Sequence, residues 1–313
     1  EDPNNIRKGN TLSDDKFPGE KFDFIMMNPP FGREWKREKS AVEAEAKKGV
    51  DGRFPAGTPA IDDSQLLFLQ NAISKMKPEG SKIAIIHNGS ALFKGNPESG
   101  ESEIRRMVLE NDLLDCIIQL PTDMFYNTGI TTYIWVLSNN KSEHRKGKVQ
   151  LIDASSLYKT MRKPLGNKNK ELPKEHIKKI TELYGEFIEN DLSKIYCNAH
   201  FGFKRIVINH GNLLPNGCLE TNNKGVPIIN KSKGNDVEIV PLDIDLNEYL
   251  NQEVKPYFPD FIIDESKSKI GYEIPFTKMF FKYELPRKST DILMEIKELD
   301  KELDKALEDF SNE

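Results

Sequence analysis

The tetrapeptide Asn28-Pro29-Pro30-Phe31 constrains this chain more than any other feature, because it directly follows a short apolar segment. Residues 21–27 form an apolar run bounded by turn signals, which predicts a short buried strand. Proline makes up about one residue in twenty of an average protein, so two adjacent prolines between an amide and an aromatic ring are rare by chance. We therefore interpret the tetrapeptide as a rigid turn with a functional role at the end of a strand.

The residue types suit the exocyclic amine of a nucleobase, which is a poor nucleophile because its lone pair is delocalised into the ring. Two acceptors that hold the amine's two N–H groups favour a geometry in which the lone pair faces a methyl donor. The Asn28 side-chain oxygen is one candidate acceptor, and a carbonyl of the Pro29-Pro30 turn is the other, since proline cannot donate and has a fixed φ. Phe31 offers a π-face on which a flipped base can stack. The alternative is a strand-ending turn in which Phe31 belongs to the core.

With this strand and turn the chain resembles amino-group DNA methyltransferases, and Asn-Pro-Pro-Phe favours adenine N6 as the acceptor. Further segments, in the expected order, are similar to the modification (methylation) subunit of type I restriction–modification systems. They are residues 63–70, 76–80, 82–89, 103–106, 120–130, 271–276 and 285–287. The resemblance implies an α/β fold: the second half of a doubly wound S-adenosylmethionine-dependent methyltransferase sheet, followed by a mainly helical C-terminal region.

The same resemblance implies the site residues. Asn28, Pro29, Pro30 and Phe31 form the catalytic motif, and Phe31, Phe125 and Tyr126 stack on the target base. Phe125 and Tyr126 precede a turn-forming group, and the alternative for each is a core aromatic. S-adenosyl-L-methionine is expected next to Asn28, and Asn10 stands where the family commonly has an acidic residue near the cofactor adenine. Methyl transfer is expected to be direct, with no covalent enzyme intermediate.

The chain lacks the glycine loop that normally holds this cofactor. None of its 20 glycines is adjacent to another or one residue away from another, although a Gly-x-Gly loop lets the backbone approach such a cofactor closely. Only 27 residues precede Asn28, too few for the first three strands and helices of a doubly wound sheet. We therefore expect a C-terminal part of a longer protein, with the cofactor loop on its N-terminal side, that is inactive alone.

Charge and cysteine usage narrow the functional classes. A net charge of −5 is unusual for a protein that holds DNA by itself, but residues 141–182 carry 12 Lys/Arg against 5 Asp/Glu. This basic segment could lie along phosphates or be a solvated linker. Three cysteines without a disulfide pattern, no signal peptide and no run of membrane-spanning length predict a cytoplasmic protein. No metal site is predicted, because the cysteines and histidines lack ligand spacing.

The chain is expected to comprise three parts. Residues 1–160 would be the C-terminal half of the catalytic domain, 161–245 a basic linker with an α/β extension, and 246–313 a C-terminal region. The pattern predicts helices at 63–76, 101–111 and 173–189, strands at 82–87, 113–120 and 132–138, and an extended segment at 201–208. Residues 34–48 are charged and helix-prone without an apolar face, which predicts an exposed or mobile insert after the turn at Asn28–Phe31.

The last predicted element is an amphipathic helix with one narrow apolar stripe. Its members recur at spacings of three and four and are Ile292, Ile296, Leu299, Leu303, Leu307 and Phe310. Such a stripe needs a partner helix, and the resemblance favours the specificity subunit over the chain's own domain. Further partners that the resemblance implies are DNA, a second copy of the modification subunit and, in some systems, a restriction (nuclease) subunit; no membrane is expected.

Two other functional classes stay open at this point. One is a self-contained amino-methyltransferase that acts on DNA adenine or on protein glutamine and carries its own target recognition. The acidic charge and the terminal helix weigh against it. The other is a non-catalytic assembly fragment that retains only subunit contacts.

Overall fold

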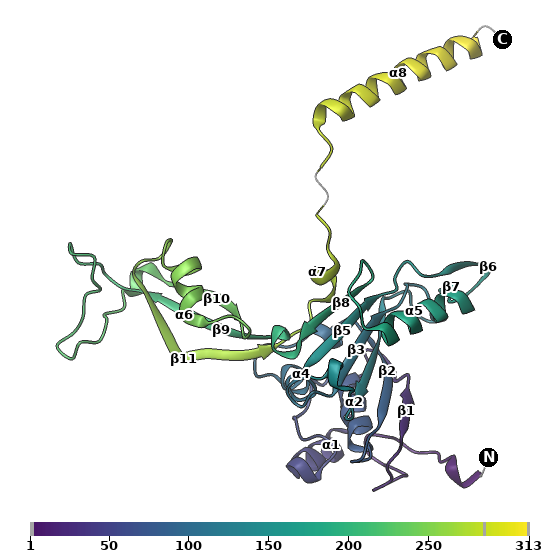
Figure 1. Ribbon diagram of the computed structural model, residues 1–313, viewed down its shortest axis with the longest axis horizontal. Helices are drawn as coiled ribbons and strands as arrows, with labels where there is room; N and C mark the ends of the chain where they lie inside the picture. Colours follow the sequence, from purple (N-terminus) through teal and green to yellow (C-terminus); the bar gives the residue numbers. More distant parts are fainter. Residues whose placement is uncertain (1–2, 284–285, 312–313) are drawn as a thin grey trace. The chain divides into compact units, whose positions relative to one another are not determined.

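The computed structural model describes residues 3–283 and 286–311, which divide into two units. The first unit runs to Met279 and the second begins at Phe280. The first is a mixed α/β unit built on a six-stranded sheet (Figure 1). Its strands are β1 Phe24–Met27, β2 Lys82–Asn88, β3 Leu114–Gln119, β4 Thr132–Ser138, β5 Lys148–Asp153 and β8 Ser193–Cys197.

The strand order of this sheet is β1-β2-β4-β3-β5-β8. β1 runs parallel to β2, and β3 runs parallel to β5, whereas β4 lies antiparallel between β2 and β3. The predicted α/β fold is therefore confirmed. The three-part division of the chain at residues 160 and 245 stays a prediction.

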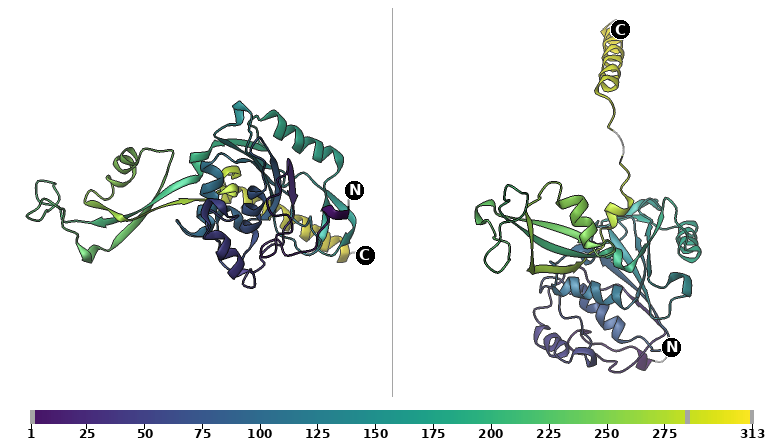
Figure 2. Two further views of the ribbon diagram at one scale, coloured as in Figure 1. Left: turned by 90° about the horizontal axis from the view of Figure 1, so that it is seen from below. Right: turned by 60° about the vertical axis from the view of Figure 1, so that its left-hand side comes forward.

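Helices cover both faces of the sheet. They are α2 Gln65–Ser74, α3 Ser90–Phe93, α4 Gly100–Glu110 and α5 Lys174–Glu186. Figure 2 shows α5 on one face of the sheet and α2 with α4 on the other. In β3 and β5 successive side chains point to opposite faces, and nearly all of them are buried, so both faces of these strands are covered.

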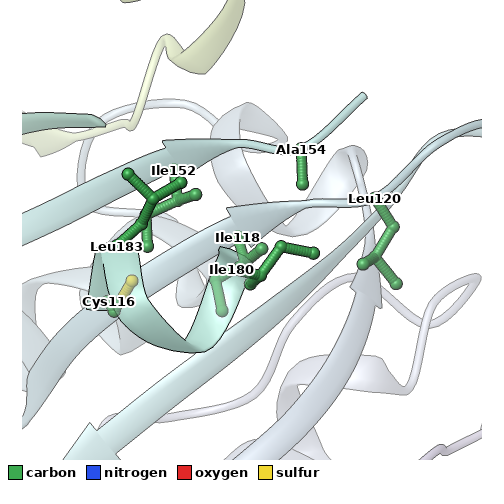
Figure 3. Close-up of a cluster of buried hydrophobic side chains, with 7 residues drawn as sticks. All are labelled: Cys116, Ile118, Leu120, Ile152, Ala154, Ile180 and Leu183. Atoms are coloured by element: carbon green, nitrogen blue, oxygen red, sulfur yellow. The ribbon is translucent and has the colours of Figure 1, made fainter. Parts of the chain in front are cut away.

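The core under α5 shows how the sequence pattern builds this packing. Ile180 and Leu183, one turn apart on α5, contact Cys116 and Ile118 of β3 and Ile152 of β5 (Figure 3). Burying a side chain of this kind contributes about 1.5–3 kcal/mol. The predicted helices and strands from 63 to 189 are confirmed with ends that differ by a few residues.

Two sequence predictions about burial are wrong. β1 is an edge strand, and Phe24 and Met26 are 77% and 87% exposed, because β2 is the strand's one partner in the sheet. The predicted exposed insert at 34–48 contains α1 Lys39–Ala46, and Trp35 and Val42 are fully buried with Phe54. The many charged residues around Trp35 and Val42 gave no sign that these two side chains are buried, because their burial depends on tertiary contacts.

A three-stranded antiparallel sheet follows in the same unit. Its order is β10-β9-β11, with β9 Gly202–His210, β10 Asn235–Pro241 and β11 Phe261–Tyr272. This sheet thus spans residues 202–272, and the sequence indicated only its segment 201–208. The turns and short helices of the first unit are η1 Pro3–Asn5, η2 Gly49–Asp51, η3 Glu143–Arg145, η4 Asn198–Phe201, η5 Lys231–Lys233, α6 Leu246–Tyr249 and η6 Leu250–Val254.

A buried arginine holds the end of β11 against α4. The Arg105 guanidinium donates hydrogen bonds to the carbonyls of Tyr272 (2.6 Å), Ala91 (3.1 Å) and Lys94 (2.8 Å). The Tyr272 hydroxyl donates to the Glu110 carboxylate at 2.6 Å. Two of the sequence segments noted above, 103–106 and 271–276, therefore meet in space, and each carbonyl that lost its donor would cost about 1–3 kcal/mol.

The second unit contains α8 Ser289–Ser311, preceded by α7 Phe276–Phe280 at the boundary. The predicted terminal helix is confirmed, and the apolar side chains from Ile292 to Leu307 are 40–59% exposed along its stripe. The side chain of Phe310 and residue Leu285 lie outside the described residues. No helix within residues 3–283 and 286–311 has the length and apolar character needed to cross a bilayer.

Candidate functional site

The sheet topology brings the predicted site residues to one edge. Asn28 follows β1, and Asn88 ends the parallel neighbour β2, so both stand at the carboxyl edge of these strands. Thr132 begins β4 directly opposite Asn88, and Gln119 ends β3. The loop from 120 to 131 therefore also lies at this edge, where open α/β sheets place their ligands.

Two aromatic side chains from separate segments meet there. The ring centroids of Phe31 and Phe125 are 6.2 Å apart and the rings lie at 80° to each other. This edge-to-face arrangement is the one that aromatic quadrupoles favour. Both rings were predicted to contact the same ligand. Phe31 is half-buried and Tyr126 is 57% exposed, so aromatic surface stays accessible.

The turn before Phe31 presents a free amide. Asn28 is exposed, and its side chain makes no hydrogen bond to any described residue. Pro29 is buried, which restricts the movement of the turn. Gly32 takes a left-handed φ of +59°, which lets the chain change direction after the turn. An amide oxygen and rigid carbonyls at the rim of an aromatic surface can accept hydrogen bonds from a planar amine.

A buried polar network supports the end of β2. The Gln65 amide donates to Asp63 Oδ2 (2.6 Å), Asn88 Oδ1 (2.8 Å) and Ser90 Oγ (2.7 Å). Its oxygen lies 3.2 Å from His87 Nδ1, and burial lowers the pKa of His87 to about 3. The neutral imidazole and the satisfied amide hold the strand end rigidly. Sequence reasoning named these segments but missed the bridging role of Gln65.

A basic hairpin adjoins the loop that carries Phe125. β6 Lys159–Leu165 and β7 Lys168–Glu171 pair antiparallel, and their turn contacts residues 122–128, here called the aromatic loop. The Asn167 N–H donates to the Tyr126 carbonyl at 3.0 Å. The Lys168 ammonium lies 5.3 Å from the centroid of the Tyr126 ring. From the sequence this stretch could lie along phosphates or be a solvated linker, and the spacing of its lysines gives no sign of their aromatic partners.

The structure gives Asn10 a local role. Its amide nitrogen donates to Glu38 Oε1 at 2.8 Å, and its oxygen accepts the backbone N–H groups of Leu12 (3.0 Å) and Ser13 (3.4 Å). The amide oxygen therefore closes a local turn, and the amide nitrogen ties that turn to Glu38. A cofactor contact by Asn10 stays a prediction.

Comparison with known proteins gives a family and several relatives. The profile of the family described as N-6 DNA Methylase matches residues 1–220. The Type I restriction enzyme MjaIX methylase subunit of Methanocaldococcus jannaschii is 29% identical over 252 residues, which cover 80% of this chain and 42% of that protein. The HindI methylase subunit of Haemophilus influenzae is 37% identical over 138 residues, which cover 44% of this chain and 28% of that protein.

One solved structure is similar in both sequence and fold. It is the type I restriction-modification system methyltransferase subunit from Streptococcus thermophilus, with 26% identity and a TM-score of 0.52. The match covers 61% of this chain and 38% of that chain. The present chain thus spans less than half the length of the relatives it matches.

Proposed function

The chain belongs to the N-6 DNA Methylase family, and on this premise we propose that it forms the base-binding half of a type I modification subunit that methylates adenine N6 in DNA. One observation carries the proposal: the rings of Phe31 and Phe125 meet at 6.2 Å beside the unengaged Asn28 amide. Aromatic surface and amine acceptors together are what a flipped adenine requires. The relatives described above are named as type I methylase subunits, which supports this substrate class.

Each site residue has a defined role in this proposal. A flipped adenine stacks on Phe31, and Phe125 with Tyr126 forms the opposite wall. The Asn28 side-chain oxygen and the Pro29 carbonyl accept the two N6–H groups, so the nitrogen lone pair points away from the ring plane. These acceptors bind more strongly as N6 becomes positively charged, which stabilises the transition state over the ground state. No side chain of the chain is needed as a nucleophile.

S-adenosyl-L-methionine supplies the methyl group in the proposed reaction. The residues of this chain fit the base side of such a site, but not the cofactor side by themselves, because the Asn10 amide is engaged and no Gly-x-Gly loop is present. We propose that the cofactor-holding strands pair with the open edge of β1. The 77% and 87% exposure of Phe24 and Met26 supports this, since a strand added there would cover apolar side chains.

The proposed assembly follows the type I relatives. A specificity subunit would choose the DNA sequence, two modification subunits would act with it, and a nuclease subunit would join in some systems. Cytoplasmic location belongs to the same proposal. The net charge of −5 supports shared DNA binding, because an acidic chain gains little from phosphates by itself.

The first test replaces Asn28 in the full-length subunit, purified with its specificity subunit. Asn28→Ala is expected to lower methyl transfer to cognate duplex by about 100-fold or more, because one acceptor needed at the transition state is lost. Incorporation of radiolabelled methyl groups measures the rate, and fluorescence anisotropy of labelled duplex measures binding, which should not change.

The matched control is Asn140→Ala. Asn140 is an exposed asparagine just after β4, at the opposite edge of the same sheet, and this variant should methylate at the wild-type rate. Near-wild-type methylation by Asn28→Ala would overturn the proposed function.

A further inference from the structure

The β6–β7 hairpin concentrates positive charge, and among its five cations only Lys170 lies within ion-pair distance of a described carboxylate, 4.0 Å from Asp123. Residues 159–171 contain five Lys/Arg and one Glu, in a chain of net charge −5. Lys159, Arg162 and Lys163 are exposed, and no carboxylate among the described residues pairs with them. Some exposed lysines elsewhere do have such partners, as Lys146 has in Glu143 and Lys178 in Glu182. The three cations on β6 are therefore available to an external anion.

The hairpin is held in a defined position beside the candidate site. The Asp123 carbonyl accepts the N–H groups of Asn169 (3.1 Å) and Lys170 (3.3 Å). The Lys170 ammonium donates to Thr122 Oγ1 at 2.9 Å and lies 4.2 Å from the centroid of the Tyr158 ring. These contacts attach β7 to the aromatic loop, whose Phe125 ring meets Phe31. The free cations on β6 consequently have a fixed relation to the base-binding residues.

The turn of the hairpin depends on close backbone approach. Gly166 has a left-handed φ of +63°, and a Cβ there would stand 2.7 Å from the Tyr126 carbonyl oxygen. Only glycine allows this approach without a shift of the loop. The turn is thus built to pack against the aromatic loop, which a solvated linker would not require.

From this arrangement we propose that the β6–β7 hairpin is a phosphate clamp for duplex DNA. Lys159, Arg162 and Lys163 bind backbone phosphates next to the nucleotide whose base enters the site, and Lys168 and Lys170 hold the hairpin against the aromatic loop. Lysine and arginine on a narrow ribbon suit a phosphate backbone, where they fix register and release counterions without reading sequence. This inference rests on the proposed function and adds the surface that positions the DNA.

The test uses the full-length modification subunit in complex with its specificity subunit. Arg162→Gln/Lys163→Gln removes two exposed charges that have no partner, so folding should be unaffected. Anisotropy titrations of labelled duplex at several salt concentrations should show a slope of log K against log salt that is shallower by about 1.8, and an affinity roughly tenfold or more weaker at low salt. Cognate and non-cognate duplexes should lose affinity alike, because phosphate contacts carry no sequence information.

The control is Lys231→Gln/Lys255→Gln, which makes the same charge change on exposed lysines of the three-stranded-sheet part. In Figure 1 that part and the β6–β7 hairpin extend to opposite sides of the six-stranded sheet. The clamp is supported if the hairpin variant alone changes the slope. Unchanged binding by the hairpin variant, or an equal change in the control, overturns it.

Two further readouts separate the clamp from the proposed function. Methylation by the hairpin variant at DNA concentrations below the Kd should fall in proportion to its weaker binding, since phosphate contacts position the duplex. If Asn28→Ala is inactive while the hairpin variant binds DNA as wild type does, only the clamp fails. If Asn28→Ala methylates normally, the proposed function fails.

Discussion

At the scale of single residues, His87 is a titratable group that the fold keeps neutral. The side chain is fully buried against Trp135, with ring centroids 5.3 Å apart, and its Nε2 has no hydrogen-bond partner among the described residues. Burial lowers the pKa of His87 to about 3. In the unfolded chain the imidazole takes up a proton near its ordinary pKa of about 6.5. Between these values the unfolded state binds more protons, so the free energy of unfolding falls as pH falls.

His87→Gln should therefore flatten the pH dependence of stability. Wild type is expected to lose up to about 1.4 kcal/mol of unfolding free energy per pH unit below 6.5 from this residue, and the variant should lose less. Denaturant titrations of the chain at half-unit steps from pH 7 to pH 5 measure the slope, which is independent of any constant cost of the substitution.

His210 provides a control of opposite sign. The hydrogen bond with Asp236, aided by Asp260, raises the pKa of His210. Its contribution to stability is therefore fully present below the ordinary pKa and is lost as pH rises through the raised one. His210→Asn should steepen the loss of stability on acidification. Equal slopes for wild type and His87→Gln would show that His87 is not buried as a neutral group.

At the scale of elements, the position of the β6–β7 hairpin depends on backbone geometry as well as charge. Gly147 and Gly166 both have a left-handed φ, +68° and +63°, but a Cβ at Gly147 would meet open space. Any L side chain at either position costs about 1–2 kcal/mol of backbone strain. A side chain at Gly166 would in addition press on the Tyr126 carbonyl. A comparison of substitutions at the two glycines therefore distinguishes the effect of backbone strain from the effect of a clash with the Tyr126 carbonyl.

Gly166→Ala should displace the hairpin from the aromatic loop, whereas Gly147→Ala should not. Both variants of the full-length subunit are expected to lose about 1–2 kcal/mol of stability. Only Gly166→Ala should also weaken DNA binding and lower methylation, as anisotropy and methyl incorporation would measure. Equal DNA affinity for the two variants would mean that the hairpin functions without its contact to Tyr126.

At the scale of the whole molecule, apolar surface stays exposed in each unit. In the first, β1 presents Phe24 and Met26 at the sheet edge; in the second, the stripe of α8 presents five aliphatic side chains from Ile292 to Leu307. A narrow stripe on a charged helix is marginal in water without a partner. We propose that the specificity subunit covers the stripe, as the type I relatives suggest.

Deletion of residues 289–313 from the full-length subunit should prevent co-purification with the specificity subunit and abolish sequence-specific methylation. Fold and cofactor binding should be retained, because α8 belongs to a separate unit. Size-exclusion chromatography of the mixed subunits measures assembly, and isothermal titration calorimetry measures cofactor binding.

Point variants test the same helix without truncation. Leu299→Asp/Leu303→Asp changes the apolar stripe, and Glu298→Gln/Lys301→Gln changes the opposite face as the control. The first should block assembly and the second should not. Co-elution of the truncated subunit with its partner would place the interface elsewhere.

Local features could be read from the sequence because their physics is local. The Asn28–Phe31 turn follows from proline geometry after an apolar run, and α8 follows from a spacing of three and four. The helices and strands between 63 and 189 were predictable for the same reason. Burial could not be predicted from the sequence in the same way. Trp35 and Val42 lie in a charged segment and are buried, whereas Phe24 and Met26 lie in an apolar segment and are exposed.

The sequence by itself determined which residues are candidates for the proposed chemistry, since the chemical properties of an amide, two prolines and an aromatic ring do not depend on the fold. Tertiary structure alone decided which of them meet. Phe31 contacts Phe125 because β4 lies antiparallel between β2 and β3, so β1, β2 and β3 all end at the same edge of the sheet. The segments that follow β1 and β3, which carry the two rings, therefore meet there. Lys168 lies near Tyr126 because Gly166 lets two backbones approach. Contacts between distant segments depend on strand order and packing, which no local pattern of residues encodes.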